Sequence, residues 1–287
     1  MQAHGATAAC MRAALLAVLA CMWAACVGAV HGGNVPQVPA GAAQHIAKHN
    51  PSRISHYDPD AVYEAVSLDN TTRKGAAHAE GWVSPAQRGG SMLDIVGNGF
   101  REPINVIISG HSDPRVLCEQ GLLDYVRSIG FSFECLHIHL GGLQYANLGD
   151  GNGWKPQMFE YRSLIYPGSP GVWLGSCWES LAGGNHFRVW KQNGTEADTG
   201  AWFLAVSKEE VRAPLTQSVA EHHTIVPNGY DLGRDLLVEA AVRGSSFRGT
   251  SWRASVEWHD LLPSGRQSIN HNITIDGRVA VLTVHRT

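Results

Sequence analysis

The sequence predicts an α+β domain with a mostly antiparallel sheet of about seven strands and two main helices. Short runs in which apolar and polar residues alternate recur between residues 104 and 284, as strands require. Apolar residues at helical spacing are found in only two long stretches, 116–129 and 231–242. Turn pairs such as Asn193-Gly194 separate neighbouring strand-like runs. Strand runs that outnumber helices favour an antiparallel sheet over a doubly wound one.

The N-terminal segment 1–29 has the composition of a signal peptide. Its single charged residue, Arg12, precedes an apolar run from Ala13 to Val30, and the small residues Val27-Gly28-Ala29 predict cleavage near Ala29. A signal anchor is the alternative, but the apolar run is short for a membrane span and ends in small residues. No later stretch approaches about 18 uninterrupted apolar residues. We therefore expect a secreted, extracellular chain without membrane contact after cleavage.

Residues 30–102 predict an irregular N-terminal arm in front of a single domain. Much of this segment is rich in Gly, Pro, Ala and His without periodicity. Asp58-Pro59 predicts a short helix through Val66, because Asp accepts from free N–H groups at a helix start and Pro suits the first turn. The α+β domain is expected from residue 103 to residue 287.

The domain is predicted to begin with a β-α-β unit. The run 104–109 is apolar, β-branched and closed by Gly110, as in a buried strand. Ser112-Asp113-Pro114 supplies a cap and a first-turn proline for a helix that ends at Gly130. A second strand then follows over 131–139. If the two strands pair directly in parallel, the crossover should be right-handed.

The remaining elements are predicted to include two hairpins. A connection at 141–180 lacks periodicity, which is typical of a functional loop or a lid. The runs 187–191 and 201–206 predict one hairpin, and Asp276-Gly277 predicts another. Further elements are expected as a strand at 223–226, a helix at 231–242 closed by Gly244, and strands at 251–258, 269–275 and 278–284.

Charge and cysteine content restrict the partners and the compartment. The formal net charge is −3 at pH 7 and no cluster of Lys or Arg is present, so we expect no nucleic-acid partner. Three of the six cysteines follow the signal peptide: Cys118, Cys135 and Cys177. An odd number in an oxidising compartment implies one bridge and one spare thiol. We expect a disulfide between Cys135 and Cys177, with Cys118 buried and free.

Three sequons are compatible with a secreted glycoprotein. They begin at Asn70, Asn193 and Asn272. Asn193 lies in a predicted turn and is the best candidate for an exposed acceptor. Asn272 lies in a predicted strand and is a poorer one.

Side chains that can bind a ligand or take part in catalysis are most closely spaced over Glu221–Asp235. In this stretch, His222 and His223 precede a turn and three charged residues follow it. Adjacent histidines in a strand point to opposite faces, so at most one of them contributes to a given site. An arginine holds a carboxylate or phosphate through two parallel hydrogen bonds. The predicted ligand-binding candidates are His186, Arg188, His223, Asp231 and Arg234. The alternative is that Arg188 pairs with Asp231 or Asp235 as part of the fold.

Metal binding has weaker support than a polar ligand site. Imidazole is a common Zn²⁺ ligand, and the candidates are His137, His139, His186 and His223. The expected domain at 103–287 contains no H-x-x-x-H or C-x-x-C pair. His137 and His139 would lie on one strand face, which is compatible with a metal but common otherwise, so satisfied core histidines are the main alternative. The run Asp150-Gly151-Asn152-Gly153 lacks the glutamate spacing of a calcium loop and favours a turn. We therefore expect no cofactor.

Five short motifs, in this order, resemble the LssY C-terminal-like domain and, more closely, its secreted fungal relatives. They are residues 103–110, 185–190, 201–205, 223–228 and 231–235, and with the intervening helix the resemblance covers about half of the chain. Asn185 stands where the family has a first histidine, and Gly233 stands where it has an acid. The resemblance implies an α+β fold and a secreted location, and it implies no settled activity.

Two functions follow from these features. The first is a secreted glycoprotein whose domain binds an unknown ligand, a small anion or a carbohydrate, through the polar candidates. The alternative is a secreted hydrolase, with or without a metal, in which a histidine acts as general base and arginines bind the anion of the substrate. For a carbohydrate, Trp154 and Trp178 are the freer aromatic residues, whereas Trp190 and Trp202 are expected in the core.

Overall fold

The computed structural model describes residues 81–96, 99–133, 142–163, 183–210 and 224–287. All of them belong to the second of two compact units, Asp58–Thr287. The predicted signal peptide, the short helix after Asp58 and the expected Cys135–Cys177 disulfide lie outside the described residues. Within the described ranges, no helix is long and apolar enough to cross a membrane.

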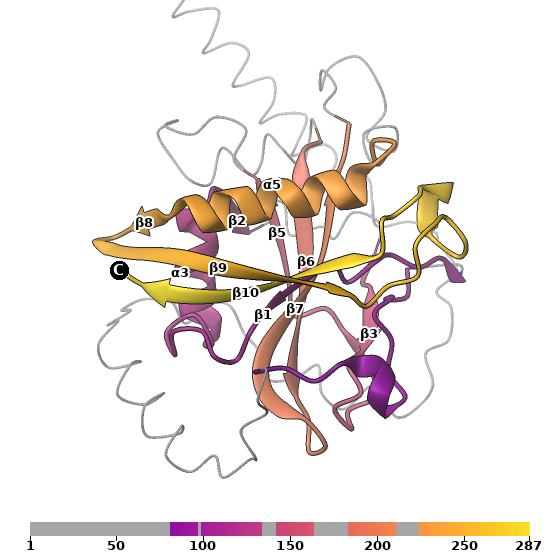
Figure 1. Cartoon of the computed structure of the whole chain (residues 1–287), viewed down its shortest axis with the longest axis horizontal. Helices are drawn as coiled ribbons and strands as arrows, with labels where there is room; N and C mark the ends of the chain where they lie inside the picture. The colour runs from indigo at the N-terminus through magenta and orange to yellow at the C-terminus, as the bar shows by residue number, and fades with distance from the viewer. Residues whose placement is uncertain (1–80, 97–98, 134–141, 164–182, 211–223) are drawn as a thin grey trace, which may run out of the picture. The chain divides into compact units, whose positions relative to one another are not determined.

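Eight strands form the main sheet, in the order β2-β5-β6-β7-β1-β10-β9-β8, and β3 and β4 form a separate pair (Figure 1). The helices are η3 (Pro85–Arg88), α3 (Glu119–Ser128), α5 (Gly229–Arg243) and η6 (Asn270–Asn272). The strands are β1 (Val106–Ile108), β2 (Phe131–Phe133), β3 (Tyr145–Asn147), β4 (Trp154–Pro156), β5 (Phe159–Ser163), β6 (Asn185–Asn193), β7 (Asp198–Lys208), β8 (Ser245–Phe247), β9 (Thr250–Asp260) and β10 (Arg278–Arg286). All neighbours are antiparallel except β1 and β10. The α+β class with two α-helices and a mostly antiparallel sheet is therefore confirmed.

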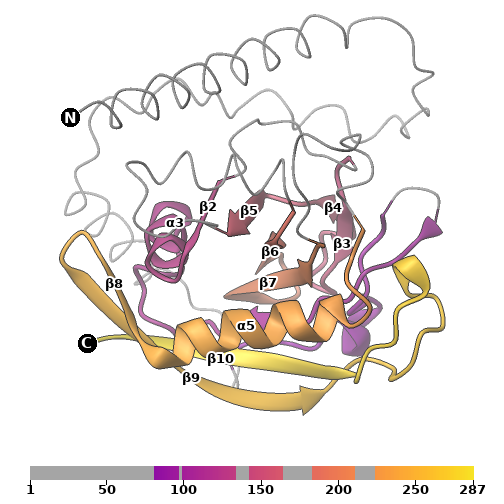
Figure 2. The same ribbon diagram turned by 90° about the horizontal axis from the view of Figure 1, so that it is seen from above.

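The sheet is curled, and both α-helices pack against its concave face (Figure 2). Side chains of a strand alternate between faces, so Phe187 and Val189 of β6 point toward the helices. They share one apolar cluster with Leu122 of α3 and Leu237 of α5. Burial of apolar surface on this face, at roughly 25 cal/mol per Å², holds the helices to the sheet.

The opposite face carries a second apolar cluster. Trp190 of β6 and Phe203 of β7 belong to it, and the segments before β1 and before β10 cover it. Trp82 and Met92 are buried there, so residues N-terminal to position 103 form part of the packed structure. Trp190 and Trp202 are both fully buried, as predicted, one on each face.

The central hairpin and the second helix agree with the prediction. Strands β6 and β7 pair in register from Asn185↔Lys208 to Lys191↔Trp202, and the turn that follows Asn193 joins them. Helix α5 begins at Gly229, two residues before the predicted start, and ends at Arg243, because Gly244 with a φ of 91° leaves helical geometry.

The predicted β-α-β unit is only partly correct. Strand β2 runs parallel to β1, but β7, β6 and β5 lie between them. Ser112 and Asp113 do not cap α3 and instead bind the end of β10. The Val284 N–H donates to Ser112 Oγ at 3.0 Å, and the Asp113 N–H donates to the Val284 carbonyl at 2.7 Å. Helix α3 therefore starts late, with Cys118 as a half-buried free thiol just before it.

Two other predictions are wrong. Residues 269–275 form no strand, because His271 and Asn272 adopt φ values of 59° and 55° within η6. The predicted hairpin at Asp276-Gly277 is therefore absent, and β10 pairs with β9 and β1 instead. The connection at 141–180 is not wholly irregular, since β3, β4 and β5 lie in its described part.

Helix α5 approaches the sheet closely at Gly233. A Cβ at this position would lie 2.8 Å from both Asn185 Oδ1 and the Ser207 carbonyl carbon, and 2.9 Å from the Lys208 nitrogen. Asn185 Nδ2 also donates to the Gly233 carbonyl at 3.0 Å. A side chain at this position would not fit in this arrangement.

Substitution Gly233→Ala tests this contact. We expect the free energy of unfolding to fall by about 1–3 kcal/mol, because backbone atoms must move apart. An exposed helical glycine would instead gain about 1 kcal/mol from the same change. Urea unfolding, with exposed Val242→Ala in the same helix as a control, measures the difference. Stabilisation by Gly233→Ala would contradict the close approach.

Candidate functional site

The second face of the sheet becomes polar over β5, β6 and β7. Glu160 pairs with Arg188 and Arg162 pairs with His186 across β5 and β6, and Ser207 of β7 lies opposite His186. We call the full set the buried polar network, because every member is 6% exposed or less. Its members are Asp94, Glu102, Gln144, Gln157, Glu160, Arg162, His186, Arg188, Ser207 and Glu209.

Ion pairs hold the β5–β7 part of this network together. Arg162 Nη2 lies 2.7 Å from Glu160 Oε1, and its Nη1 lies 3.4 Å from Glu209 Oε2. Arg188 Nη2 lies 3.7 Å from the other oxygen of Glu160. Buried charges are tolerated only when they are paired and hydrogen-bonded in this way. Removing one partner would leave an uncompensated charge in the sheet.

His186 lies between the arginines and Glu209. Its Nε2 is 3.2 Å from Ser207 Oγ and 3.4 Å from Arg188 Nη1. Because guanidinium only donates, Nε2 accepts, and the proton is assigned to Nδ1, 3.7 Å from Glu209 Oε1. Burial lowers the pKa of His186 to about 4; Glu209 opposes this shift, and Arg162 and Arg188 reinforce it. The ring is therefore neutral at ordinary pH.

The network continues away from the strands through amide side chains. Gln157 Nε2 donates to Glu160 Oε2 at 3.4 Å, and Gln157 Oε1 accepts from the Gln144 N–H at 3.0 Å. Gln144 Nε2 then donates to Glu102 Oε2 at 3.2 Å. The Glu102 N–H donates to Asp94 Oδ1 at 2.8 Å. One continuous path of polar contacts therefore connects β6 with the segment before β1.

Asp94 and Glu102 form an acid pair at the far end of the path. Burial, followed by the charge of Glu102, raises the pKa of Asp94 well above its ordinary value. The folded chain therefore disfavours the ionised form of Asp94.

Buried atoms of the network that have no hydrogen-bond partner among the described residues include Asp94 Oδ2, Gln144 Oε1 and His186 Nδ1. Native proteins pair the large majority of buried polar atoms, so such a group calls for an explanation. A bound small molecule with several polar atoms would supply the missing partners.

Arg234, another predicted ligand-binding residue, has a structural role. Its guanidinium is 2% exposed and bonds both Asp276 oxygens at 2.7 and 2.9 Å, Asp235 at 2.8 Å and the Arg278 carbonyl at 2.8 Å. The guanidinium carbon also lies 5.0 Å from the centre of the Trp258 ring. These contacts tie α5 to the start of β10 and leave no pair of N–H groups free to hold a ligand.

Asp231 belongs to the same arginine cluster. Burial and then the charge of Asp276 raise the pKa of Asp231 to about 6, although Arg234, 3.5 Å away, opposes the shift. The predicted alternative that Arg188 pairs with Asp231 or Asp235 is wrong, because both aspartates pair with Arg234. The sequence-based patch is therefore divided between two places, with His186 and Arg188 in the buried polar network.

The other metal and ligand candidates lie outside the part of the chain that the structure describes. These are His137, His139 and His223. Among the described residues, no group of three His, Cys, Asp or Glu side chains could hold a metal ion.

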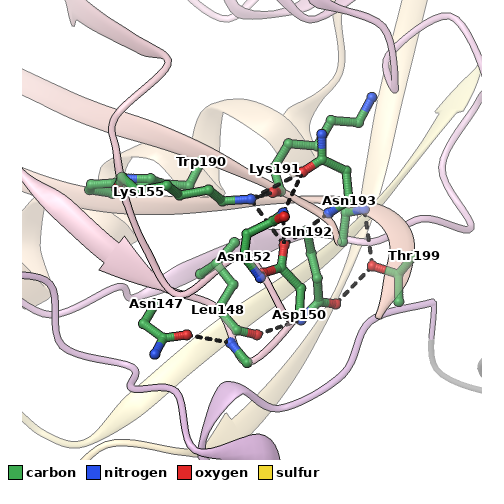
Figure 3. Close-up of polar contacts among 12 residues, drawn as sticks. Asn147, Leu148, Asp150, Asn152, Lys155, Trp190, Lys191, Gln192, Asn193 and Thr199 are labelled. Carbon is green, nitrogen blue, oxygen red and sulfur yellow. Dashed lines mark hydrogen bonds and ion pairs between the residues drawn. The ribbon is translucent and has the colours of Figure 1, made fainter. Parts of the chain in front are cut away.

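The run Asp150-Gly151-Asn152-Gly153, considered above as a calcium loop, forms a turn, and the ammonium group of Lys155 bonds to it (Figure 3). Lys155 Nζ lies 3.0 Å from Asp150 Oδ2 and 3.1 Å from Asn193 Oδ1, and it also donates to the Lys191 carbonyl. The Asn152 N–H donates to Asp150 Oδ1 at 3.1 Å, which closes the turn. The lysine takes the position that a cation would take in such a loop.

The sequons differ in their surroundings. Asn193 is exposed at the tip of the β6–β7 hairpin, as expected. Asn272 is exposed in η6 rather than placed in a strand. Asn70 lies outside the described residues. Glycosylation of these asparagines stays a prediction.

The sequence interpretation missed Arg162 and all four acids of the buried polar network, which are Asp94, Glu102, Glu160 and Glu209. The run Phe159-Glu160-Tyr161-Arg162 alternates aromatic and charged residues, which is a strand signal. Its position in a segment rich in Gly and Pro obscured it. Asp94 and Glu102 lie in irregular backbone, where no periodicity could identify them.

Comparisons of the chain with protein-family models, with curated proteins and with solved structures found no match.

The arginine cluster gives a stability test. For Arg234→Met we expect the free energy of unfolding to fall by about 2–4 kcal/mol, because three carboxylates and a carbonyl lose their donor. Exposed Arg266→Met should change it by less than about 0.5 kcal/mol. Urea unfolding of both variants provides the comparison. Equal effects would mean that the Arg234 cluster is solvated and free to bind a ligand.

His186 gives a test of burial by pH. We expect its imidazole to stay neutral, with the proton on Nδ1, until the pH approaches about 4. The unfolded chain binds this proton near pH 6.5, so the unfolding free energy should fall as the pH drops from about 6.5 toward 4. Nitrogen-15 NMR of the ring measures the first effect, and His186→Gln should lack this contribution to the second. Titration near pH 6.5 would show that water reaches the ring.

Proposed function

We propose that the domain is a secreted glycoprotein that binds a small polar ligand, a carbohydrate or an anion, at the buried polar network. His186 and Arg188 lie at the centre of this site, and His223 stays a sequence-based candidate for it. The unpartnered atoms at Asp94, Gln144 and His186 carry the proposal. A ligand there would complete hydrogen bonds that the described residues leave open.

The types of unpartnered atoms favour a hydroxyl-rich ligand within this class. Gln144 Oε1 needs a donor, His186 Nδ1–H needs an acceptor, and Asp94 offers both when it is protonated. A sugar hydroxyl donates and accepts, whereas a phosphate or carboxylate mainly accepts. Arg188 adds donors that suit either ligand. A carbohydrate therefore matches the whole set better than a simple anion does.

Hydrolysis of a carbohydrate is the second candidate function, and the acid pair favours it. Glycoside hydrolysis uses one protonated and one ionised carboxyl group. Asp94, whose pKa is raised, is the candidate for the proton donor in this alternative, and Glu102 is the candidate for the second carboxyl group. In this alternative, His186 and Arg188 position the substrate rather than carry out the reaction.

Saturation-transfer NMR of the purified full chain with a panel of monosaccharides and disaccharides tests the proposal. We expect at least one sugar to bind and to shift the His186 ring signals. Arg188→Lys and His186→Gln should each weaken that binding by about tenfold or more, because each removes a hydrogen bond in a buried site. Exposed Arg266→Gln should leave it unchanged.

Folding of each variant is checked by circular dichroism, so that loss of binding is separated from loss of structure. Release of a free sugar in the same panel would identify hydrolysis. If neither sugars nor inorganic phosphate bind, and both network variants are only destabilised, the network is purely structural and the proposal is wrong.

A further inference from the structure

One face of the β3–β4 pair exposes a row of mostly apolar side chains. More buried and more exposed positions alternate along both strands and just beyond their ends. Gln144, Ala146 and Gln157 lie on the inner side. Residues paired across two strands share a face, so the outward side chains lie together. We call this set the outer strip, and its members are Leu143, Tyr145, Asn147, Trp154, Pro156 and Met158.

The outer strip is continuous. Leu143, Trp154 and Met158 are 45%, 43% and 37% exposed. The Gln157 N–H donates to the Gln144 carbonyl at 2.8 Å, so the strand pairing extends past β3 and brings Leu143 beside Met158. Single exposed apolar residues are normal on a protein surface, whereas a contiguous patch indicates a surface that meets a partner.

The area of the strip is small for an interface between folded proteins. Five positions along each strand span roughly 16 Å. Ile95 bridges to Tyr145 and adds a third row about 4.8 Å away. The face therefore covers on the order of 200 Å², compared with about 800 Å² per partner in a stable protein interface. A short length of a polymer matches this area, and a second copy of the chain does not.

The charge of the strip favours a neutral partner. None of its six members is charged. The guanidinium carbon of Arg101 lies 5.7 Å from the centre of the Trp154 ring, so this cation is engaged with the indole. The formal net charge of the chain is −3, which repels anionic polymers and anionic lipid at long range.

Tyr145 and Trp154 place two aromatic rings on this face. They occupy diagonal positions of the strand pair, because Tyr145 pairs with Pro156 and Trp154 pairs with Asn147. Diagonal neighbours are roughly 7–8 Å apart, so successive units of one sugar chain can contact both rings. The C–H groups on the flat side of a sugar pack against an aromatic ring, while the Tyr145 hydroxyl bonds the sugar hydroxyls at the edge.

We propose that the outer strip binds a neutral polysaccharide through Trp154 and Tyr145. This surface is separate from the buried polar network, whose members Gln144 and Gln157 lie on the opposite face of the same strands. The strip holds the domain on an extended glycan, whereas the network encloses a small ligand. Neither proposal depends on the other.

Co-sedimentation of the purified full chain with microcrystalline cellulose and with chitin, together with calorimetric titration with cellohexaose and chitohexaose, tests the proposal. We expect binding to at least one polymer and to its hexamer. Trp154→Ala should weaken that binding by about tenfold or more, because an aromatic anchor is lost. Tyr145→Ala should weaken it by about threefold or more. Leu236→Ala is the matched control, since Leu236 is 39% exposed but lies on α5, and it should change the affinity less than about twofold.

Two further sets of variants separate the strip from other effects. Trp154→Phe keeps a smaller aromatic ring and should bind with intermediate affinity. His186→Gln and Arg188→Lys should leave polysaccharide binding unchanged, so loss of the network site is distinguished from loss of the strip. Circular dichroism and urea unfolding check that each variant is folded.

Other occupants of the strip give different results. Absence of binding to both polymers, or equal losses in Leu236→Ala, would overturn the proposal. Sedimentation with phosphatidylcholine vesicles that depends on Trp154, without polysaccharide binding, would assign the strip to a lipid surface instead. Dimerisation in analytical ultracentrifugation that depends on Trp154, again without polysaccharide binding, would assign it to a second copy of the chain.

Discussion

Burial of both sheet faces is the constraint on which the rest of this structure depends. Because side chains alternate along a strand, β6 and β7 contribute buried side chains to both faces of the sheet. One is mainly apolar and holds α3 and α5. The other changes from apolar at Trp190 to polar at Arg188 and His186 along a single strand. The polar half is buried, so its charged members must pair with one another.

Two buried arginines, Arg234 and Arg162, differ in the partners that surround them. Arg234 is enclosed by the carboxylates of one helix turn and one strand start, which are close in sequence or directly opposite in space. Arg162 instead pairs with Glu160 on its own strand and with Glu209, which follows β7 and reaches Arg162 only when the sheet has formed. The first cluster fixes a junction, and the second joins segments that are far apart in the chain. The sequence pattern placed Arg234 in one site with Arg188, which pairs with Glu160 in the second cluster.

An element of this fold is predictable from the sequence when its alternation or helical spacing of apolar residues extends over enough positions to be recognised. β6, β7 and α5 have such repeats, and β9 and β10 were also predicted within a few residues of their bounds. Short strands such as β3 and β4 lack enough residues to show alternation. Ile269, Ile273 and Ile275 suggested a strand, but all three are buried from irregular backbone and a turn. Of the site, His186 and Arg188 were predicted, whereas their acidic partners depend on pairing between distant strands, which no local pattern reveals.

The tip of the β6–β7 hairpin is held by the side chain of Lys155. Its ammonium group joins the loop at Asp150 to the tip at Asn193 with a charge that is covalently part of the chain. A loop held by calcium opens when the ion is chelated or diluted, because the ion can leave. This loop carries its own counter-ion, so its shape is independent of the mineral content of the surrounding fluid. The same chemistry makes the hairpin depend on one side chain, and loss of that amine would uncover a cluster of oxygen atoms ready to accept a free cation.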